Sequence, residues 1–285
     1  MTLPTFGPHA GPEAIVTIAQ TADRLGLHTV AVTERLLLPA GEGWDNAYGL
    51  PEEYVWEPIE VLTWAAAHTE RVRLATGIVN ALFQAPIVLA RRLATLDRLS
   101  GGRLDVGLGQ GWLPEEFVAT GVPTSRRGQG FEDHLAAMRA CWGPDPVEHH
   151  SDDYVIPTAT VGPKPVRGAA IPVLIGAVAR PAVERAARLG GFVTGVRDWD
   201  TSATEIGWYR GAGGVGPVVV QVMSSWGASD DEPVDAFAAW AVAEVDHAGA
   251  AGADEIRFEL NLTSVPVDRQ VAALEALTAA LALDA

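Results

Sequence analysis

The chain has 285 residues, a formal net charge of −16 and a single cysteine, Cys141. The negative charge argues against general binding to nucleic acid or to anionic membranes, and one cysteine excludes an internal disulfide. No apolar run approaches the roughly 20 residues of a membrane span. The start, MTLPTFGPHAG, also lacks the pattern of a signal peptide, so we expect a cytoplasmic protein.

Strand and helix patterns alternate along the chain without a domain linker. Short β-branched apolar runs indicate strands, and apolar residues at helical spacing, bounded by proline or glycine, indicate helices. Eight such strands predict an α/β fold, a (β/α)8 TIM barrel, as one domain over residues 1–285. In chain order we predict a strand at 3–6, a helix at 12–26, a strand at 28–34, a helix at 57–70, a strand at 72–79, a helix at 86–100, strands at 103–109 and 171–176, a helix at 179–190, strands at 191–196 and 216–223, a helix at 231–252, a strand at 253–262 and a closing helix at 267–285.

Three segments depart from this alternation. About sixty residues after Trp112 hold one predicted helix, 131–142, and a hairpin-like stretch, which makes an insertion after strand 4. Residues 198–214, between strands six and seven, show only a marginal helix pattern. Residues 36–56 are too long for a plain connector and predict a lid over the pocket. The aromatic residues of that loop are Trp44, Tyr48, Tyr54 and Trp56, which alternatively anchor it to the barrel.

The active site of a TIM barrel lies at the carboxyl ends of its strands. One such end, Gly176 to Ala179, runs into a helix with Pro181 in its first turn. The free N–H groups of a helix start can hold a phosphate, and Arg180 adds a cation. The alternative is an ordinary turn, since any strand-to-helix connection favours small residues.

Other charged residues give weaker signals. Arg126 and Arg127 either reach an anionic part of a cofactor or form a solvated surface pair. Glu115 and Glu116 are expected to begin the next helix. The histidines have no metal-ligand spacing, so we predict no metal site.

Four stretches of the chain carry a family resemblance. They are 21–39 (TADRLGLHTVAVTERLLLP), 71–112, 109–142 (GQGWLPEEFVATGVPTSRRGQGFEDHLAAMRACW) and 161–191 (VGPKPVRGAAIPVLIGAVARPAVERAARLGG). Together they resemble the luciferase-like monooxygenase superfamily, whose members use reduced flavin or the deazaflavin coenzyme F420 on a TIM barrel. The resemblance covers most of residues 14–195 and fades beyond Gly195.

The resemblance implies a set of cofactor-binding positions. Relatives bind the cofactor phosphate at the loop matching 176–179, and commonly carry a non-prolyl cis peptide that matches Gly77–Ile78. Gln110 and Trp112 fall where relatives shape the ring pocket, although some deazaflavin dehydrogenases have a catalytic carboxylate where Trp112 stands. The predicted cofactor-binding residues are Thr76, Gly77, Ile78, Asn80, Gln110, Trp112, Arg127, Gly176, Ala177, Val178 and Ala179.

The catalytic prediction is Glu34 with Arg35, where many deazaflavin-dependent relatives have Asp-His. Arginine stays charged and cannot act as a base, so Glu34 is left to hold a proton and Arg35 to bind an anionic group. The alternative is an ion pair at the mouth of the barrel. The proton-shuttling role of the missing histidine is not carried over.

The leading functional prediction is an oxidoreductase that exchanges hydride between coenzyme F420 and a small organic molecule, as a homodimer. The first alternative is an FMN-dependent two-component monooxygenase. The second is a barrel that binds a flavin without turnover. The missing histidine, Gly190-Gly191 in place of Asp-Gly, and the short connection after Gly195 favour that second alternative.

Overall fold

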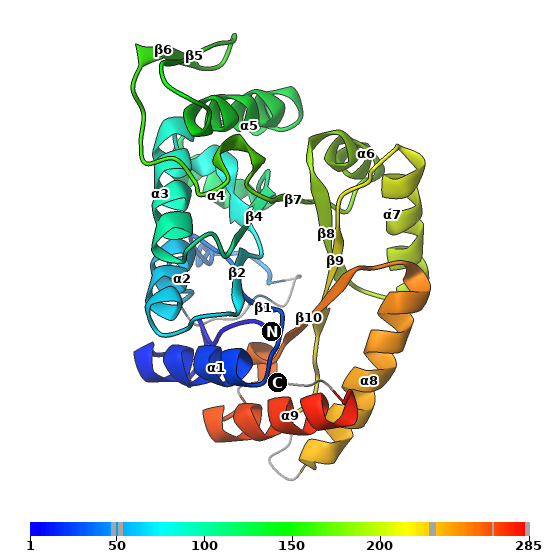
Figure 1. Ribbon diagram of the computed structural model, residues 1–285. Helices are drawn as coiled ribbons and strands as arrows, with labels where there is room; N and C mark the ends of the chain where they lie inside the picture. The colour runs from blue at the N-terminus through cyan, green and yellow to red at the C-terminus, as the bar shows by residue number, and fades with distance from the viewer. Residues whose placement is uncertain (47–49, 51–53, 228–231, 264, 283–285) are drawn as a thin grey trace.

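The structure, a computed structural model, describes residues 1–46, 50, 54–227, 232–263 and 265–282. One mostly parallel sheet has the strand order β1-β2-β4-β7-β8-β9-β10, and helices cover its outside (Figure 1). β3 pairs with β4, and β5 and β6 form a separate hairpin. The strands are β1 (Thr29–Val32), β2 (Arg73–Thr76), β3 (Val79–Asn80), β4 (Leu104–Gly109), β5 (Val147–His150), β6 (Val155–Ala159), β7 (Val173–Gly176), β8 (Gly191–Val196), β9 (Val218–Met223) and β10 (Glu255–Glu259).

The helices follow the predicted alternation. Most begin with proline in the first turn, where its missing N–H costs nothing. They are α1 (Pro12–Arg24), α2 (Pro58–Ala67), α3 (Pro86–Leu99), α4 (Pro114–Thr120), α5 (Gln129–Trp142), α6 (Arg180–Leu189), α7 (Trp199–Gly211), α8 (Val234–Ala251) and α9 (Val267–Ala280), with 3₁₀ turns η1 (Ala81–Phe83), η2 (Thr124–Arg126), η3 (Gly168–Ala170) and η4 (Asn261–Thr263).

The first residues of the chain close the barrel between β1 and β10. Thr2 N donates to Phe258 O at 3.0 Å, and Leu3 N donates to Ala31 O at 2.8 Å. The predicted strand at 3–6 is therefore reduced to a single bridge at Thr2. Its ladder stops because Pro4, the next residue but one, has no N–H to donate.

The predicted third strand, 72–79, is divided into β2 and β3. The peptide bond between Gly77 and Ile78 is cis, at the position that the family resemblance implied. Leu74 pairs with Leu104, whereas Val79 pairs with Leu108, so this strand has one residue more than β4 over the same stretch. Such an extra residue is a β-bulge, a feature common beside active sites.

The insertion after β4 contains a helix that Glu115 and Glu116 begin, as expected, and the helix predicted at 131–142. α4 precedes α5, and begins with Pro114, Glu115 and Glu116, as expected of a helix start. It ends at Thr120, and Gly121, which follows, has a φ of 69° that suits glycine. The β5–β6 hairpin projects from the far end of the insertion, beyond α5 (Figure 1).

The connection between β8 and β9 corrects the expectation of a marginal helix. α7 is a regular helix of 13 residues. Asp198 caps it, because its Oδ1 accepts a hydrogen bond from Thr201 N at 2.7 Å. Ile206 and Tyr209 are buried on its inner face. The cap and two spaced apolar residues suffice where the overall pattern is polar.

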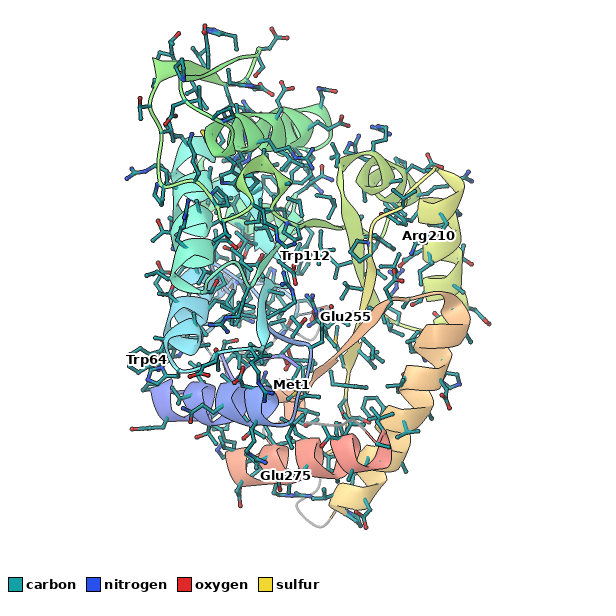
Figure 2. The ribbon with its side chains drawn as sticks, in the orientation of Figure 1. Met1, Trp64, Trp112, Arg210, Glu255 and Glu275 are labelled. Atoms are coloured by element: carbon teal, nitrogen blue, oxygen red, sulfur yellow. The ribbon has the colours of Figure 1, made fainter. Side chains whose placement is uncertain are left out.

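The barrel lumen has a charged end and an apolar end. At the amino ends of the strands, Arg73 on β2 pairs with Asp105 on β4 at 2.5 Å. Nearer the carboxyl ends, Leu174, Val193 and Val219 form a small cluster against Ile78. In Figure 2, Met1 and Glu255 lie on the side of α1 and α9, and Trp112 lies towards α5 and α6.

Candidate active site

A cavity of about 680 Å³ opens at the carboxyl ends of the barrel strands. Its walls come from the bulge between β2 and β3, the loop after β4, the β7–α6 connection, the end of β8 and β9. Every predicted cofactor-binding residue lines it except Thr76. Thr76 lies behind the wall, where its Oγ1 donates to Gly107 O and accepts from Gly107 N, both at 2.7 Å.

One wall of the cavity is the cis bulge, and glycines make room for it. A Cβ on Gly109 would stand 2.0 Å from Ile78 Cδ1, and one on Gly176 would stand 2.8 Å from the same atom. A Cβ on Gly107 would lie 1.9 Å from Thr76 O. Gly109 and Gly176 therefore let the Ile78 side chain lie between β4 and β7, and Gly107 makes room for the carbonyl of Thr76.

Asn80 connects the bulge to the loop after β4. It is buried, and its Oδ1 accepts a hydrogen bond from Gly111 N at 3.0 Å. Gln110 connects the same loop to the insertion, because its Oε1 accepts from Gly128 N at 2.7 Å. Trp112 is 46% exposed at the cavity edge, so its indole forms an open side wall.

The opposite end of the cavity suits an anion. Gly176 to Ala179, Pro181 and Ala182 line it, so the start of α6 faces the space. The N–H groups of a helix start carry partial positive charge. Arg185, one turn further along α6, also lines the cavity and pairs with Glu132 at 2.7 Å.

The structure shows which arginines line the cavity and which do not, a distinction that the sequence alone could not make. Arg127 lines the cavity, with its guanidinium 4.9 Å from the ring of Phe117. Arg126 turns away and pairs with Asp153 at 2.9 Å. Arg180 is outside the cavity lining, because its Nε bonds Glu184 at 2.8 Å.

Glu34 and Arg35 lie outside the cavity lining, on the loop after β1. The Oε2 of Glu34 accepts a hydrogen bond from Asn80 N at 2.6 Å, which places the carboxylate directly behind the bulge strand. Burial raises the pKa of Glu34 to about 7, the carboxylates of Glu57 and Glu116 add to this rise, and the Asn80 N–H opposes it.

Glu116 holds the start of the loop that contains Glu34. It is 2% exposed on α4, and its Oε1 accepts from Leu36 N at 2.8 Å. Burial raises the pKa of Glu116, although this hydrogen bond and the positive charge of Arg35 oppose the rise. Glu116 thus ties the loop to the insertion.

Of the aromatic residues assigned to the lid, Tyr48 lies outside the described residues.

Among the lining residues outside the predicted cofactor-binding set, three have polar side chains: Gln221, Thr194 and Arg185. Gln221 interrupts the β-branched run of β9, and a lone amide in a buried strand is a signal that could have found it. Thr194, at the end of β8, donates through Oγ1 to Oε2 of the buried Glu205 at 2.7 Å. Nothing in the local pattern separates Arg185 from the other arginines of α6.

Two further observations concern the described part of the chain. It contains no cluster of three or more histidine, cysteine, aspartate or glutamate residues placed to hold a metal ion. None of its helices is long and apolar enough to cross a membrane.

His134 is fully buried, burial lowers its pKa to about 4, and its Nε2 lies 2.9 Å from Gln84 O.

A parallel barrel with a cavity at its strand ends is the architecture of a TIM-barrel enzyme. A family model described as luciferase-like monooxygenase matches residues 2–282. The chain therefore belongs to the luciferase-like monooxygenase family, an oxidoreductase family.

Several individual proteins are similar to this chain in sequence or in fold. An uncharacterized protein of Mycobacterium tuberculosis is 36% identical over 166 residues, which is 56% of this chain and 58% of that relative. Monooxygenase RslO1 from Streptomyces bottropensis has a TM-score of 0.77 at 23% identity, covering 99% of this chain and 98% of that one. The coenzyme F420 dependent tetrahydromethanopterin reductase from Methanopyrus kandleri has a TM-score of 0.70 at 15% identity, covering 97% of each chain. The two solved structures show the fold that the sequence predicted.

Proposed function

We propose that this chain is an F420-dependent oxidoreductase that exchanges hydride with a small organic molecule. The observation that carries the proposal is the cavity, which has a helix start at one end and the cis bulge as a wall. Membership of the luciferase-like family supports a flavin-type cofactor. The resemblance of 109–128 and of 33–39 to the deazaflavin branch favours F420 over FMN.

The described residues fit a phosphate-bearing cofactor with a flat ring. The α6 N-terminus, Arg127 and Arg185 provide donors and positive charge for a phosphate. Gly109 and Gly176 leave room for the Ile78 side chain, so Ile78 offers an apolar surface for a ring. When bound, the deazaflavin would supply hydride transfer, which the side chains of this site cannot perform.

The protein's own contribution would be orientation, exclusion of water and proton control. Glu34 is the acid–base candidate, because a carboxyl group whose pKa lies near 7 can both hold and release a proton. It would act from behind the bulge strand, through its contact with Asn80, which lines the cavity. Its proton would be held at Oε1, since Oε2 accepts from Asn80 N. Arg35 would bind an anionic part of cofactor or substrate. The loop 36–56 would set substrate selectivity, and we propose a homodimer in the cytoplasm.

The decisive experiment is a fluorescence or calorimetric titration of the purified protein with F420 and, separately, with FMN. Ala182→Asp tests the anion end, since it places a carboxylate in the first turn of α6 inside the cavity. We expect it to weaken cofactor binding by at least about tenfold, or about 1.4 kcal/mol. Arg180→Met is the matched control, because Arg180 stands beside the cavity and pairs with Glu184.

Each outcome has a separate meaning. Tight F420 binding that Ala182→Asp weakens and Arg180→Met leaves unchanged supports the proposal. Tight FMN binding with weak F420 binding would replace it by the FMN-dependent monooxygenase, which needs a partner reductase. Binding of either cofactor without turnover over a broad substrate panel would favour the non-catalytic barrel. Binding of neither would refute the proposed function while leaving the fold intact.

A further inference from the structure

Arg257 is a buried arginine whose two terminal nitrogens lack a hydrogen-bond acceptor within the described part of the chain. It is the middle residue of β10, it is 1% exposed, and its Nε donates to Glu255 Oε1 at 2.5 Å. Nη1 and Nη2 meet no hydrogen-bond acceptor among the residues that the structure describes. A buried guanidinium with unused donors lowers stability unless another group supplies the acceptors.

The position of Arg257 connects it to the cavity. Its Cα is paired with that of Gln221 on β9, and paired residues of neighbouring strands point to the same side of a sheet. Gln221 lines the cavity, so the Arg257 side chain also points into the lumen, where it is covered. Neighbouring strands lie about 4.8 Å apart. Over so short a distance through buried protein, a charge is weakly screened.

Arg257 forms an ion pair with Glu255 at 2.5 Å, and the other carboxylates near it have partners of their own. Glu255 is shared, because its Oε2 lies 3.3 Å from His28 Nδ1 while its Oε1 bonds Arg257. Glu259 uses its Oε1 to accept from both N and Nδ2 of Asn261. The Asp105 carboxylate is bonded through both oxygens to the arginine of β2.

We propose that Gln221 and Arg257 form an electropositive floor of the cavity, which stabilises negative charge on the ring of the bound cofactor. The inference rests on the proposed function. Gln221 presents a neutral amide to the cavity, and Arg257 supplies charge behind it. Charge beside a flavin-type ring tunes its electron affinity. If Arg257 only filled the lumen, replacing it would weaken anionic and neutral ligands equally.

The test compares ring charge states in wild type, Arg257→Met and Arg257→Lys. The probe is FMN, in its oxidised form with a neutral ring and in its dithionite-reduced form with an anionic ring. We expect Arg257→Met to lower the affinity ratio of reduced to oxidised FMN by about tenfold, equal to about 30 mV for two electrons. Arg257→Lys, which keeps the charge, should retain the ratio within about threefold. An unchanged ratio in Arg257→Met would overturn the inference.

If the wild-type protein binds only F420, the same comparison uses oxidised F420 above and below the pKa of its ring hydroxyl. Gln221→Glu serves if Arg257→Met does not fold. Its carboxylate would pair with the free Nη groups, so we expect a higher melting temperature together with the lowered affinity ratio. A melting temperature that falls, or an affinity ratio that stays at the wild-type value, contradicts the inference. Failure of wild type to bind either cofactor would instead refute the proposed function.

Discussion

Replacing Glu34 by glutamine should stabilise the protein at high pH and impair its chemistry. The carboxylate oxygen that accepts from Asn80 N is retained as an amide oxygen, so the local hydrogen bond survives. The substitution removes the ionisation of the Glu34 side chain. Burial raises the pKa of Glu34 from 4.5 to about 7, so the folded state holds a proton that the unfolded state has already released between these values. Stability therefore falls as pH rises through this window.

The expected size follows from that shift. Complete ionisation would cost the folded state about 3 kcal/mol, and screening at this partly exposed site reduces the cost to about 2 kcal/mol. In urea unfolding, Glu34→Gln should exceed wild type by about 2 kcal/mol at about pH 8.5 and by little at about pH 4.5. The control is Glu13→Gln, which removes an exposed carboxylate from the first turn of α1 and should not reproduce a gain of about 2 kcal/mol at about pH 8.5.

The same variant tests the catalytic proposal. If Glu34 transfers a proton, Glu34→Gln should lower turnover by about 10²- to 10⁴-fold while cofactor affinity stays near wild type. A stability difference independent of pH would refute the account of the buried carboxylate. Normal turnover in a variant with the expected stability profile would remove Glu34 from the chemistry alone.

Two further predictions test the cavity walls. Gly109→Ala should cost about 1–3 kcal/mol by forcing a methyl group into Ile78, and Ile78→Ala in the same chain should recover part of that loss. Urea unfolding of Gly109→Ala, Ile78→Ala and the double variant measures the free energies of unfolding. Strictly additive losses would contradict the packing argument. Arg127→Met should weaken cofactor binding by about tenfold and reduce its salt dependence, because a cation is lost from the cavity. Arg126→Met, whose arginine pairs with Asp153, should leave the titration unchanged, and an equal loss in both variants would count against the assignment.

The barrel could be predicted because its strands and helices are each encoded locally. β-branched runs and proline-started helices recur through the chain, and only elements with mixed signals were mistaken. α7 carries a polar sequence whose helix depends on the Asp198 cap, which a count of apolar spacing does not register. The first strand was predicted too long, because the apolar pattern at 3–6 was read without regard to Pro4, which has no backbone N–H to donate.

The candidate site could be predicted in part, along the segments covered by the resemblance. Residues on turns with glycine or proline were found, since those residue types restrict the backbone where a ligand approaches. Gln221 and Arg257 lie on strands after Gly195, where the resemblance fades. Their importance depends on register between β9 and β10, which brings together residues 36 positions apart. Sequence also gave no means of separating Arg127 from Arg126, because their opposite directions are set by Phe117 and Asp153.

The extra residue of the third strand also decides which way the following side chains face. Side chains alternate along a strand, so an inserted residue inverts the pattern beyond it. Ile78 and Asn80 consequently face the lumen, and Val79 packs among the helices. If Gly77 were absent, the alternation would continue unbroken. Asn80 would then point into the apolar layer and Val79 into the cavity. The number of residues in this strand thus decides which side chains face a ligand. Deleting one residue would turn every side chain after it to the opposite face of the strand.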